Sequence, residues 1–448
     1  MSRAPVSLWC PVVVALLASP LLAGGLTYPP GFALKEVPDP LSGQNPKFPL
    51  VPKAAPAPGE SFFDLRFGTI LTRATTRLRH EYSRFDPFNA GQSLILLDDQ
   101  ATGEWPIYRT QGPAYDTPQN LVTKIAEGAE PRWDPADPKL LWFLRDFCIL
   151  QLNTETKQET VVKDFSKDPL LKPILKRERD LYRITTKDEG ETSLDKRYWA
   201  LCLQGANQDY RLRYLFTWDR TADKILALHK LTQKEADLID WVGMSPRGTW
   251  VLIGSGAGKG KFAGLSIVDK GLKSFHRLAS ETAHSDVGLD ARGNEVIVMQ
   301  NNRTDHIDLI PLDPATQPVE SPEGYAKSTI KPLIRLFYAE DSPDGLGSGV
   351  HISCNHAGYC LVSTVTEPRH PEKNWLDRTI TLVRLDPQKP RVFYLAKVYN
   401  TSGAYWEETH GSITNDGRKA VWASNWGQHV GQEKAFLMVL DLPPLPAP

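Results

Sequence analysis

The chain of 448 residues carries almost no net charge, because 52 lysine and arginine residues nearly balance 53 aspartate and glutamate residues. A protein that binds nucleic acid or an anionic membrane surface through a broad electrostatic field has a marked excess of basic residues. The balance therefore gives no reason to expect a nucleic-acid partner. Any specific recognition must come from a local site.

Long apolar runs are absent after the first 25 residues. A membrane-spanning helix needs about 20 consecutive apolar residues, so we expect no membrane insertion. Residues 1–25 combine Arg3, an apolar run over residues 6–22 and small residues at 23–25. This is the pattern of a secretory signal peptide. We therefore expect a protein that is secreted or delivered to the periplasm.

Cysteine is scarce, and only Cys148, Cys202, Cys354 and Cys360 remain after the predicted signal peptide. Their spacing does not resemble a metal-binding pair. Cys354 and Cys360 flank a five-residue turn, so they can face each other across a hairpin. Export to an oxidising compartment would allow a disulfide between them. Two small buried thiols are the alternative, and both interpretations stay open.

One short pattern is repeated seven times after residue 75. Each copy has an inner strand, a tight turn built on Gly, Asp or Pro, and a strongly apolar strand. The copies span residues 79–99, 130–146, 191–204, 241–255, 283–300, 349–364 and 409–424. Their turns are separated by about 45 to 65 residues, which is the period of propeller blades. We therefore predict an all-β fold, a seven-bladed β-propeller.

The remaining segments are assigned around a propeller that spans residues 61–442. Residues 26–60 are rich in proline and predict an extended arm, and residues 443–448 predict a disordered tail. Few strand residues follow the last copy, so we expect an N-terminal strand to close the last blade and remove an exposed sheet edge. The insertion between the second and third copies predicts a short helix within residues 169–182, and a long irregular insertion is expected over residues 311–348.

Four of the seven copies begin with a histidine: His80, His284, His351 and His410. These copies are the first, fifth, sixth and seventh, which are adjacent in a closed ring. Counted back from the turn glycine, all four offsets are odd, so the side chains share a face if the strands are regular. The offsets also predict that His351 and His410 lie level. His284 and His80 should be displaced by about 6 to 7 Å for each two-residue step.

His284, His351 and His410 lie on neighbouring blades and can offer three neutral imidazole ligands to a divalent metal such as manganese, zinc or calcium. Glu408 or Gln428 can add a fourth ligand. The alternative is that each histidine only hydrogen-bonds the next blade, as polar residues in propeller channels do.

A different set, His80, Tyr82 and Arg84, occupies alternate positions of the first copy. An imidazole, a phenol and a guanidinium suit proton abstraction, proton donation and neutralisation of a carboxylate. We therefore consider these residues, together with His410, as candidate catalytic residues. A hydrogen-bonded and partly buried strand start is the structural alternative.

Three further residues are candidates for substrate binding. Glu130 and Arg132 occupy the corresponding region of the second copy and are expected to continue the polar rim. Trp241 in the fourth copy is expected to offer an apolar platform for a sugar ring.

The turn and strand of residues 414–427, TNDGRKAVWASNWG, resemble those of periplasmic Tol-type propellers and of secreted propeller polysaccharide lyases, especially oligogalacturonate lyases and ulvan lyases. The resemblance covers most of residues 69–442. It implies that His284, His351 and His410 hold a metal as propeller histidines of oligogalacturonate lyases do, although the glutamine and the closely spaced histidine pair of that family have no clear counterpart in this sequence.

The set His80, Tyr82 and Arg84 resembles, in residue type only, the set that ulvan lyases use for proton transfer and carboxylate binding. The reaction implied is β-elimination at the mouth of the axial channel, with an acidic, uronate-containing polysaccharide or oligosaccharide as substrate. A non-catalytic exported propeller that binds a protein or glycan partner stays open as the alternative, since fold does not fix function. A hydrolase is less favoured, because the repeats show no pair of carboxylates at matching positions.

Overall fold

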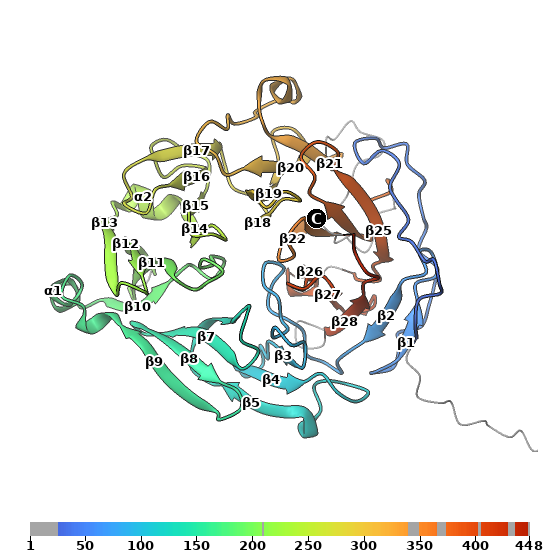
Figure 1. Ribbon diagram of the computed structural model, residues 1–448, viewed down its shortest axis with the longest axis horizontal. Coiled ribbons are helices and arrows are strands. Elements are labelled where there is room, and N and C mark those ends of the chain that lie inside the picture. The colour runs from blue at the N-terminus through green and yellow to red at the C-terminus, as the bar shows by residue number, and fades with distance from the viewer. Residues whose placement is uncertain are drawn as a thin grey trace, which may run out of the picture.

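The computed structural model describes residues 26–207, 210–338, 349–364, 373–401, 405–428 and 435–446. Seven antiparallel sheets are arranged in a ring around a central axis (Figure 1). The predicted seven-bladed, all-β propeller is therefore confirmed. The inner strand of each sheet faces the axis, and it is the first strand of the sheet in blades 2 to 6 and β26 (Ser412–Ile413) in the last blade (Figure 1). The residues that begin and end these inner strands define the two mouths of the channel.

Blades 2 to 6 each contain four strands in sequence order. Blade 2 contains β6 (Ala129–Trp133), β7 (Leu140–Arg145), β8 (Cys148–Asn153) and β9 (Gln158–Asp164). Blade 3 contains β10 (Leu181–Thr185), β11 (Tyr198–Gly205), β12 (Leu212–Asp219) and β13 (Lys224–Lys230). Blade 4 contains β14 (Ile239–Met244), β15 (Val251–Ser255), β16 (Leu265–Val268) and β17 (Phe275–Ala279). Blade 5 contains β18 (Ser285–Leu289), β19 (Glu295–Asn301), β20 (His306–Pro311) and β21 (Lys331–Arg335). Blade 6 contains β22 (Val350–Ser353), β23 (Tyr359–Thr364), β24 (Thr379–Arg384) and β25 (Arg391–Lys397).

Blade 1 has three regular strands, β3 (Leu94–Leu96), β4 (Trp105–Arg109) and β5 (Leu121–Ile125). The segment before β3, which was expected to be a strand, is irregular and is attached by two isolated bridges, Arg79 to Asp98 and Phe88 to Ile95. The side chains of His80, Tyr82 and Arg84 in this segment therefore do not follow the alternation of a regular strand, in which every second side chain points to the same face.

The last blade is closed by the N-terminal part of the chain, as predicted. Its sheet has the order β1-β2-β28-β27-β26. The strands are β1 (Ser61–Phe63), β2 (Ile70–Arg73), β26 (Ser412–Ile413), β27 (Lys419–Ser424) and β28 (Phe436–Asp441). Leu71 in β2 is buried in the apolar cluster between blades 6 and 7. The N-terminal segment supplies two strands, so the ring is held shut by main-chain hydrogen bonds between the two ends of the propeller.

The third copy differs from the prediction. Its inner strand is β10, and residues 191–197, with which the third copy was expected to begin, belong to the loop of residues 186–197 between β10 and β11. The sequence TKDEGETSLDKR in this loop lacks the alternation of a half-buried strand. Several of its residues line a cavity on the channel axis, as described below.

Short helices lie in the segments that connect the strands. They are α1 (Lys172–Arg177), α2 (Gln233–Leu238), η1 (Pro118–Asn120), η2 (Phe165–Lys167), η3 (Pro322–Lys327) and η4 (Tyr405–Glu407). Helix α1 lies within the region predicted to contain a helix. The insertion expected over 311–348 contains η3 and the outer strand β21, and residues 339–348 lie outside the described part. None of the helices in the described ranges has the length and hydropathy of a membrane span.

The segments outside the ring pack against it. The arm of residues 26–60 runs along the outside of blade 6 (Figure 1), where Val37 N donates to Val392 O and Tyr394 N donates to Lys35 O. At the other end, Tyr359 donates to the carbonyl of Pro446 at 2.8 Å. Residues 443–446, predicted to be disordered, therefore have a defined contact. The predicted signal peptide of residues 1–25 lies outside the described residues.

Apolar side chains from neighbouring blades interdigitate between the sheets. Trp142 of blade 2 packs with Trp199, Phe216 and Trp218 of blade 3 in one such cluster, and all four are buried. The hairpin turns also need glycine: Gly417 has φ of +69°, and a Cβ there would lie 2.6 Å from the His356 ring. Interdigitated apolar side chains on both faces of the sheets make the ring rigid enough to hold polar groups at its axis.

Candidate functional site

Three histidines from adjacent blades meet at one mouth of the channel. His284 directly precedes β18, His351 lies in β22 and His410 precedes β26. The ring centroids of His351 and His410 are 4.3 Å apart, and those of His284 and His351 are 4.8 Å apart. We call these three residues the histidine cluster. The structure therefore brings together the three predicted metal ligands.

The predicted displacement of His284 along its strand is wrong. Its ring lies nearly as close to His351 as the ring of His410 does. A residue offset counted from a turn glycine fixes a position within one blade, but it does not fix the stagger between neighbouring blades. The side chain also reaches toward the next blade, where its ring interacts with the main chain at Val350.

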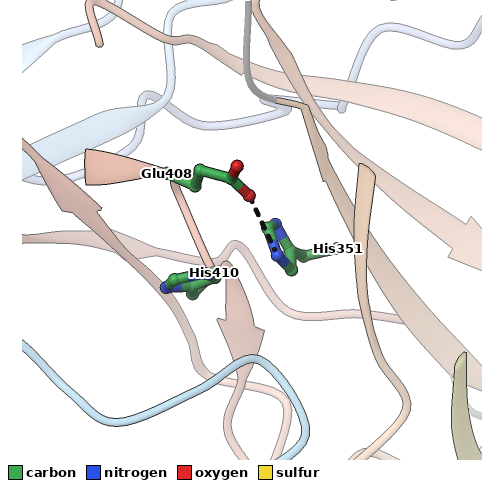
Figure 2. A group of neighbouring side chains, drawn as sticks. All are labelled: His351, Glu408 and His410. Carbon is green, nitrogen blue, oxygen red and sulfur yellow. Dashed lines mark ion pairs between the residues drawn. The ribbon is translucent and has the colours of Figure 1, made fainter. Parts of the chain in front are cut away.

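Glu408 completes a compact donor set with two of the histidines. One ligand atom each from His351, Glu408 and His410 lie within 4.8 Å of one another (Figure 2). Oε2 of Glu408 is 3.4 Å from Nε2 of His351. Gln428, the other predicted fourth ligand, is exposed and does not belong to this set.

The imidazoles of His351 and His410 are completely buried, at 0% exposure. Both nitrogens of each ring lack a hydrogen-bond partner among the described residues. Burial, together with the neighbouring histidines, holds the pKa of both rings well below the usual range, so both are neutral. An unsatisfied buried polar group costs about 1 to 3 kcal/mol. A divalent cation would engage these lone pairs and Glu408, so the residues fit a metal.

Gln300 is a further candidate that the sequence pattern did not indicate. It pairs with His284 across blade 5, where Gln300 N donates to His284 O at 2.8 Å. Its Oε1 is buried, and the side chain interacts with the ring of His284. Opposite residues of a strand pair share a face, so the amide belongs beside the histidine cluster. Recognition of the β18–β19 register could have identified it.

Tyr82 lies against the histidine cluster, as its expected catalytic role requires. Its ring centroid is 5.2 Å from that of His410 and 5.7 Å from that of His351. Burial, with a smaller contribution from Glu189, raises the pKa of Tyr82, so the phenol stays protonated. A hydrogen bond joins Tyr82 to Tyr405, which is 44% exposed at the channel mouth. The two phenols therefore connect the buried cluster with solvent.

His80 supports the cluster from outside it. Nε2 of His80 lies 2.5 Å from the main-chain oxygen of His410. His410 has φ of +44°, a conformation uncommon for a residue other than glycine. Burial lowers the pKa of His80 to about 4. This geometry gives His80 a role in positioning the His410 main chain, in place of direct proton transfer to a substrate.

Arg84 is already paired. Its Nη2 lies 2.9 Å from Oε2 of Glu189 and donates to Oγ of Ser285 at 3.1 Å. The guanidinium covers the ring of Trp241 at 4.4 Å, and Trp241 is only 2% exposed. The prediction that Trp241 offers a platform to a sugar ring is therefore wrong, because Arg84 occupies its face. The charge of Arg84 is balanced by Glu189, so it is not free for a substrate carboxylate.

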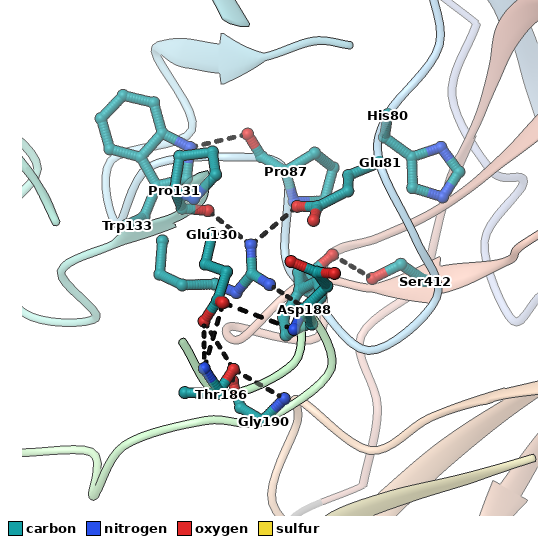
Figure 3. A network of polar contacts seen from close by, with 12 residues as sticks. His80, Glu81, Pro87, Glu130, Pro131, Trp133, Thr186, Asp188, Gly190 and Ser412 are labelled. Atoms are coloured by element: carbon teal, nitrogen blue, oxygen red, sulfur yellow. Dashed lines mark hydrogen bonds and ion pairs between the residues drawn. The ribbon is translucent and has the colours of Figure 1, made fainter. Parts of the chain in front are cut away.

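Glu130 and Arg132 belong to a network that ties blades 1, 2 and 3 together (Figure 3). The carboxylate of Glu130 accepts hydrogen bonds from Thr185 Oγ1 and from both N and Oγ1 of Thr186, at 2.5 to 3.0 Å. Nη1 of Arg132 lies 2.7 Å from Oε2 of Glu81. Glu130 is buried with its oxygens engaged by protein donors, which contradicts its expected place on a substrate-binding rim. We call this the Glu130 network.

Cys354 and Cys360 face each other across the hairpin of blade 6, as their spacing suggested. Both are buried thiols, and their sulfurs lie 2.9 Å apart. The alternative of two buried thiols is therefore the state that the structure holds. Burial raises the pKa of the Cys354 thiol well above its usual range.

No protein-family model matches this sequence, and no curated protein matches it significantly. Solved structures are similar in fold. One is an oligogalacturonate lyase in complex with manganese, with a TM-score of 0.56 and 11% identity over 86% of this chain and 96% of that chain. Another is an oligogalacturonate lyase from Vibrio parahaemolyticus, with a TM-score of 0.53 and 12% identity over the same shares. In fold, this chain is therefore similar to the propellers of oligogalacturonate lyases.

Proposed function

We propose that this protein is a divalent-metal-dependent lyase that cleaves uronate-containing glycans by β-elimination, and that it acts after export. The observation that supports the proposal most is the set of unpartnered, neutral imidazole nitrogens of His351 and His410 beside Glu408. A buried set of this kind has the donors that manganese or zinc takes in proteins. The manganese complex of a lyase with the same fold agrees with it.

In β-elimination, a base takes the proton from the carbon next to the uronate carboxylate, and the electrons of that C–H bond form a carbon–carbon double bond. The glycosidic C–O bond breaks, and the departing oxygen keeps its electron pair and is protonated. A bound metal supplies positive charge to the carboxylate, which acidifies the neighbouring C–H group. Arg84 does not serve this purpose, because Glu189 and Ser285 engage it.

Tyr82 is the residue best placed for the proton on the departing oxygen. It is protonated, it touches the histidine cluster, and Tyr405 connects it to solvent. The exposed ring of Tyr405 also lies where a glycan would enter, 4.9 Å from the ring of His410. Aromatic faces at such mouths bind the apolar faces of sugar rings.

The test is an absorbance assay for newly formed unsaturated uronate, using the chain without residues 1–25 and a panel of acidic polysaccharides and oligosaccharides. We expect a signal with Mn²⁺ that a chelator removes. His410→Ala should abolish it, whereas His276→Ala, which changes a histidine of the outer strand β17, should not. If no polysaccharide or oligosaccharide gives an absorbance signal while the protein still binds metal, the result would favour a non-catalytic propeller that binds a glycan or protein partner.

A further inference from the structure

A second polar site lies at the other end of the inner strands. There, a cavity of about 90 Å³ opens on the channel axis. Its lining includes Arg132, Glu191, Lys196, Asn355 and Asn415. His410 and Asn415 are five residues apart, and a strand rises about 3.3 Å per residue. We call this the turn-side cavity, and it is separate from the histidine cluster.

Lys196 is the most unusual group in the turn-side cavity. It is 9% exposed, and its ammonium group has no hydrogen bond or ion pair to any described residue. Buried lysines are almost always paired. Burial lowers the pKa of Lys196, and Glu191 is the opposing charge that acts on it most strongly. The fold removes this cationic donor from water and gives it no partner. It therefore indicates a ligand with an anionic or carbonyl oxygen.

Glu191 supplies the complementary group. Its carboxylate also has no hydrogen-bond or ion-pair partner among residues that the structure describes, although Lys196 and Arg132 are near enough to influence it. Burial raises its pKa despite these cations. A second, smaller cavity of about 30 Å³ is lined by both Glu191 and Lys196 as well. The two groups therefore face open space from the same loop, residues 186–197.

The walls and the volume restrict what fits. Phe85, Leu194, Val287 and Leu289 supply apolar lining. A water molecule needs about 10 to 15 Å³ of such space, so the larger cavity holds roughly six to nine water-sized groups. A disaccharide is too large for this space. A small molecule with a carboxylate for Lys196 and a hydroxyl or amine for Glu191 has both the size and the chemistry.

We propose that the turn-side cavity binds a small hydroxy or amino carboxylic acid, with Lys196 recognising its carboxylate and Glu191 its hydroxyl or amine. This site is independent of the proposed lyase activity. When the ligand binds, the unpaired Lys196 ammonium and the unpaired Glu191 carboxylate each gain a charge-assisted hydrogen bond. Such hydrogen bonds are stronger than those between neutral groups.

The test is isothermal titration of the full mature chain with four probes: L-lactate, L-serine, propionate and glycerol. We expect saturable binding of lactate or serine, and weaker binding of propionate and glycerol, which each lack one of the two groups. Lys196→Met should weaken binding at least about tenfold, whereas Lys259→Met, a change at an exposed lysine in the loop between β15 and β16, should leave it unchanged.

Glu191→Gln should reduce the preference for lactate or serine over propionate. Leu194→Trp provides a second variant, because Leu194 is 44% exposed at the cavity and a larger side chain there obstructs it without removing a polar group. Circular dichroism checks that each variant is folded, and Mn²⁺ binding should be the same in all of them. The proposal is wrong if no probe binds the wild type saturably, or if Lys196→Met and Leu194→Trp both bind as the wild type does.

Discussion

Replacing Glu130 by alanine should lower the free energy of unfolding by about 3 to 5 kcal/mol and leave metal binding unchanged. The carboxylate comes from β6 of blade 2 and accepts from Thr185, the last residue of β10 in blade 3, and from Thr186, which follows it. Three groups that donate at 2.5 to 3.0 Å, together with the main-chain N–H of Asp188 at 3.4 Å, lose their acceptor in the variant. Each hydrogen bond to a charged group contributes about 1.5 to 3 kcal/mol.

The sum of those contributions is an upper limit. The hydroxyl of Thr186 retains a second acceptor, the carbonyl of Gly190 at 3.3 Å, and the desolvation cost of the buried carboxylate disappears with it. The main-chain N–H of Thr186 has no such replacement, because both of its contacts are to Glu130. The expected loss is therefore smaller than the sum of these contributions but well above that of a surface change.

Urea unfolding followed by tryptophan fluorescence measures this loss. Glu159→Ala is the matched control, because Glu159 lies in the same blade and forms an exposed ion pair with Arg145. Such a pair contributes about 0 to 1 kcal/mol. A Glu130→Ala protein within about 1 kcal/mol of the wild type would refute the structural role. Loss of metal binding without loss of stability would instead place Glu130 in the site.

Three further outcomes are expected. Burial raises the pKa of Asp308 to about 6, above its unfolded value, so Asp308 should contribute about 2 kcal/mol of stability at pH 4 that is lost by pH 7; urea unfolding at the two pH values should show that the change in stability of Asp308→Asn differs from that of the wild type by this amount, and an equal change in the two proteins would contradict the assignment. Leu71→Ala in the closing strand β2 should cost about 2 to 4 kcal/mol in the same assay, and a loss below about 1 kcal/mol would mean that β2 does not hold the ring shut. Tyr82→Phe should lower kcat of glycan cleavage more than it changes KM, with Mn²⁺ affinity retained; an equal kcat would exclude the phenol as the proton donor.

The sequence predicted the architecture because a propeller repeats one supersecondary unit. A turn built on Gly, Asp or Pro and an apolar strand recur in the copies, and the shortage of strands after residue 424 indicated closure by the N-terminal segment. The histidine cluster could also be predicted, since His284, His351 and His410 occupy corresponding positions at the starts of adjacent blades.

What the sequence could not supply was the partner of each polar residue. Arg84 and Trp241 belong to blades 1 and 4, and their contact depends on how side chains meet across the channel. Glu130 was assigned to a substrate-binding rim because it occupies the same region of its copy as the candidate residues of the first copy. Its carboxylate oxygens instead accept hydrogen bonds from Thr185 and Thr186, where a loop begins whose course was not predicted. That loop, residues 186–197, also carries Glu191 and Lys196 to the axis, so the turn-side cavity had no signature in the repeat.

The most direct test of the metal site is a titration of the purified, metal-free protein with Mn²⁺ by isothermal calorimetry. We predict saturable binding that is weakened at least about tenfold by His351→Ala and by His410→Ala but is unchanged in His276→Ala. Absence of binding to the wild type, or wild-type affinity in both cluster variants, would contradict the central claim that these buried imidazoles hold a divalent metal.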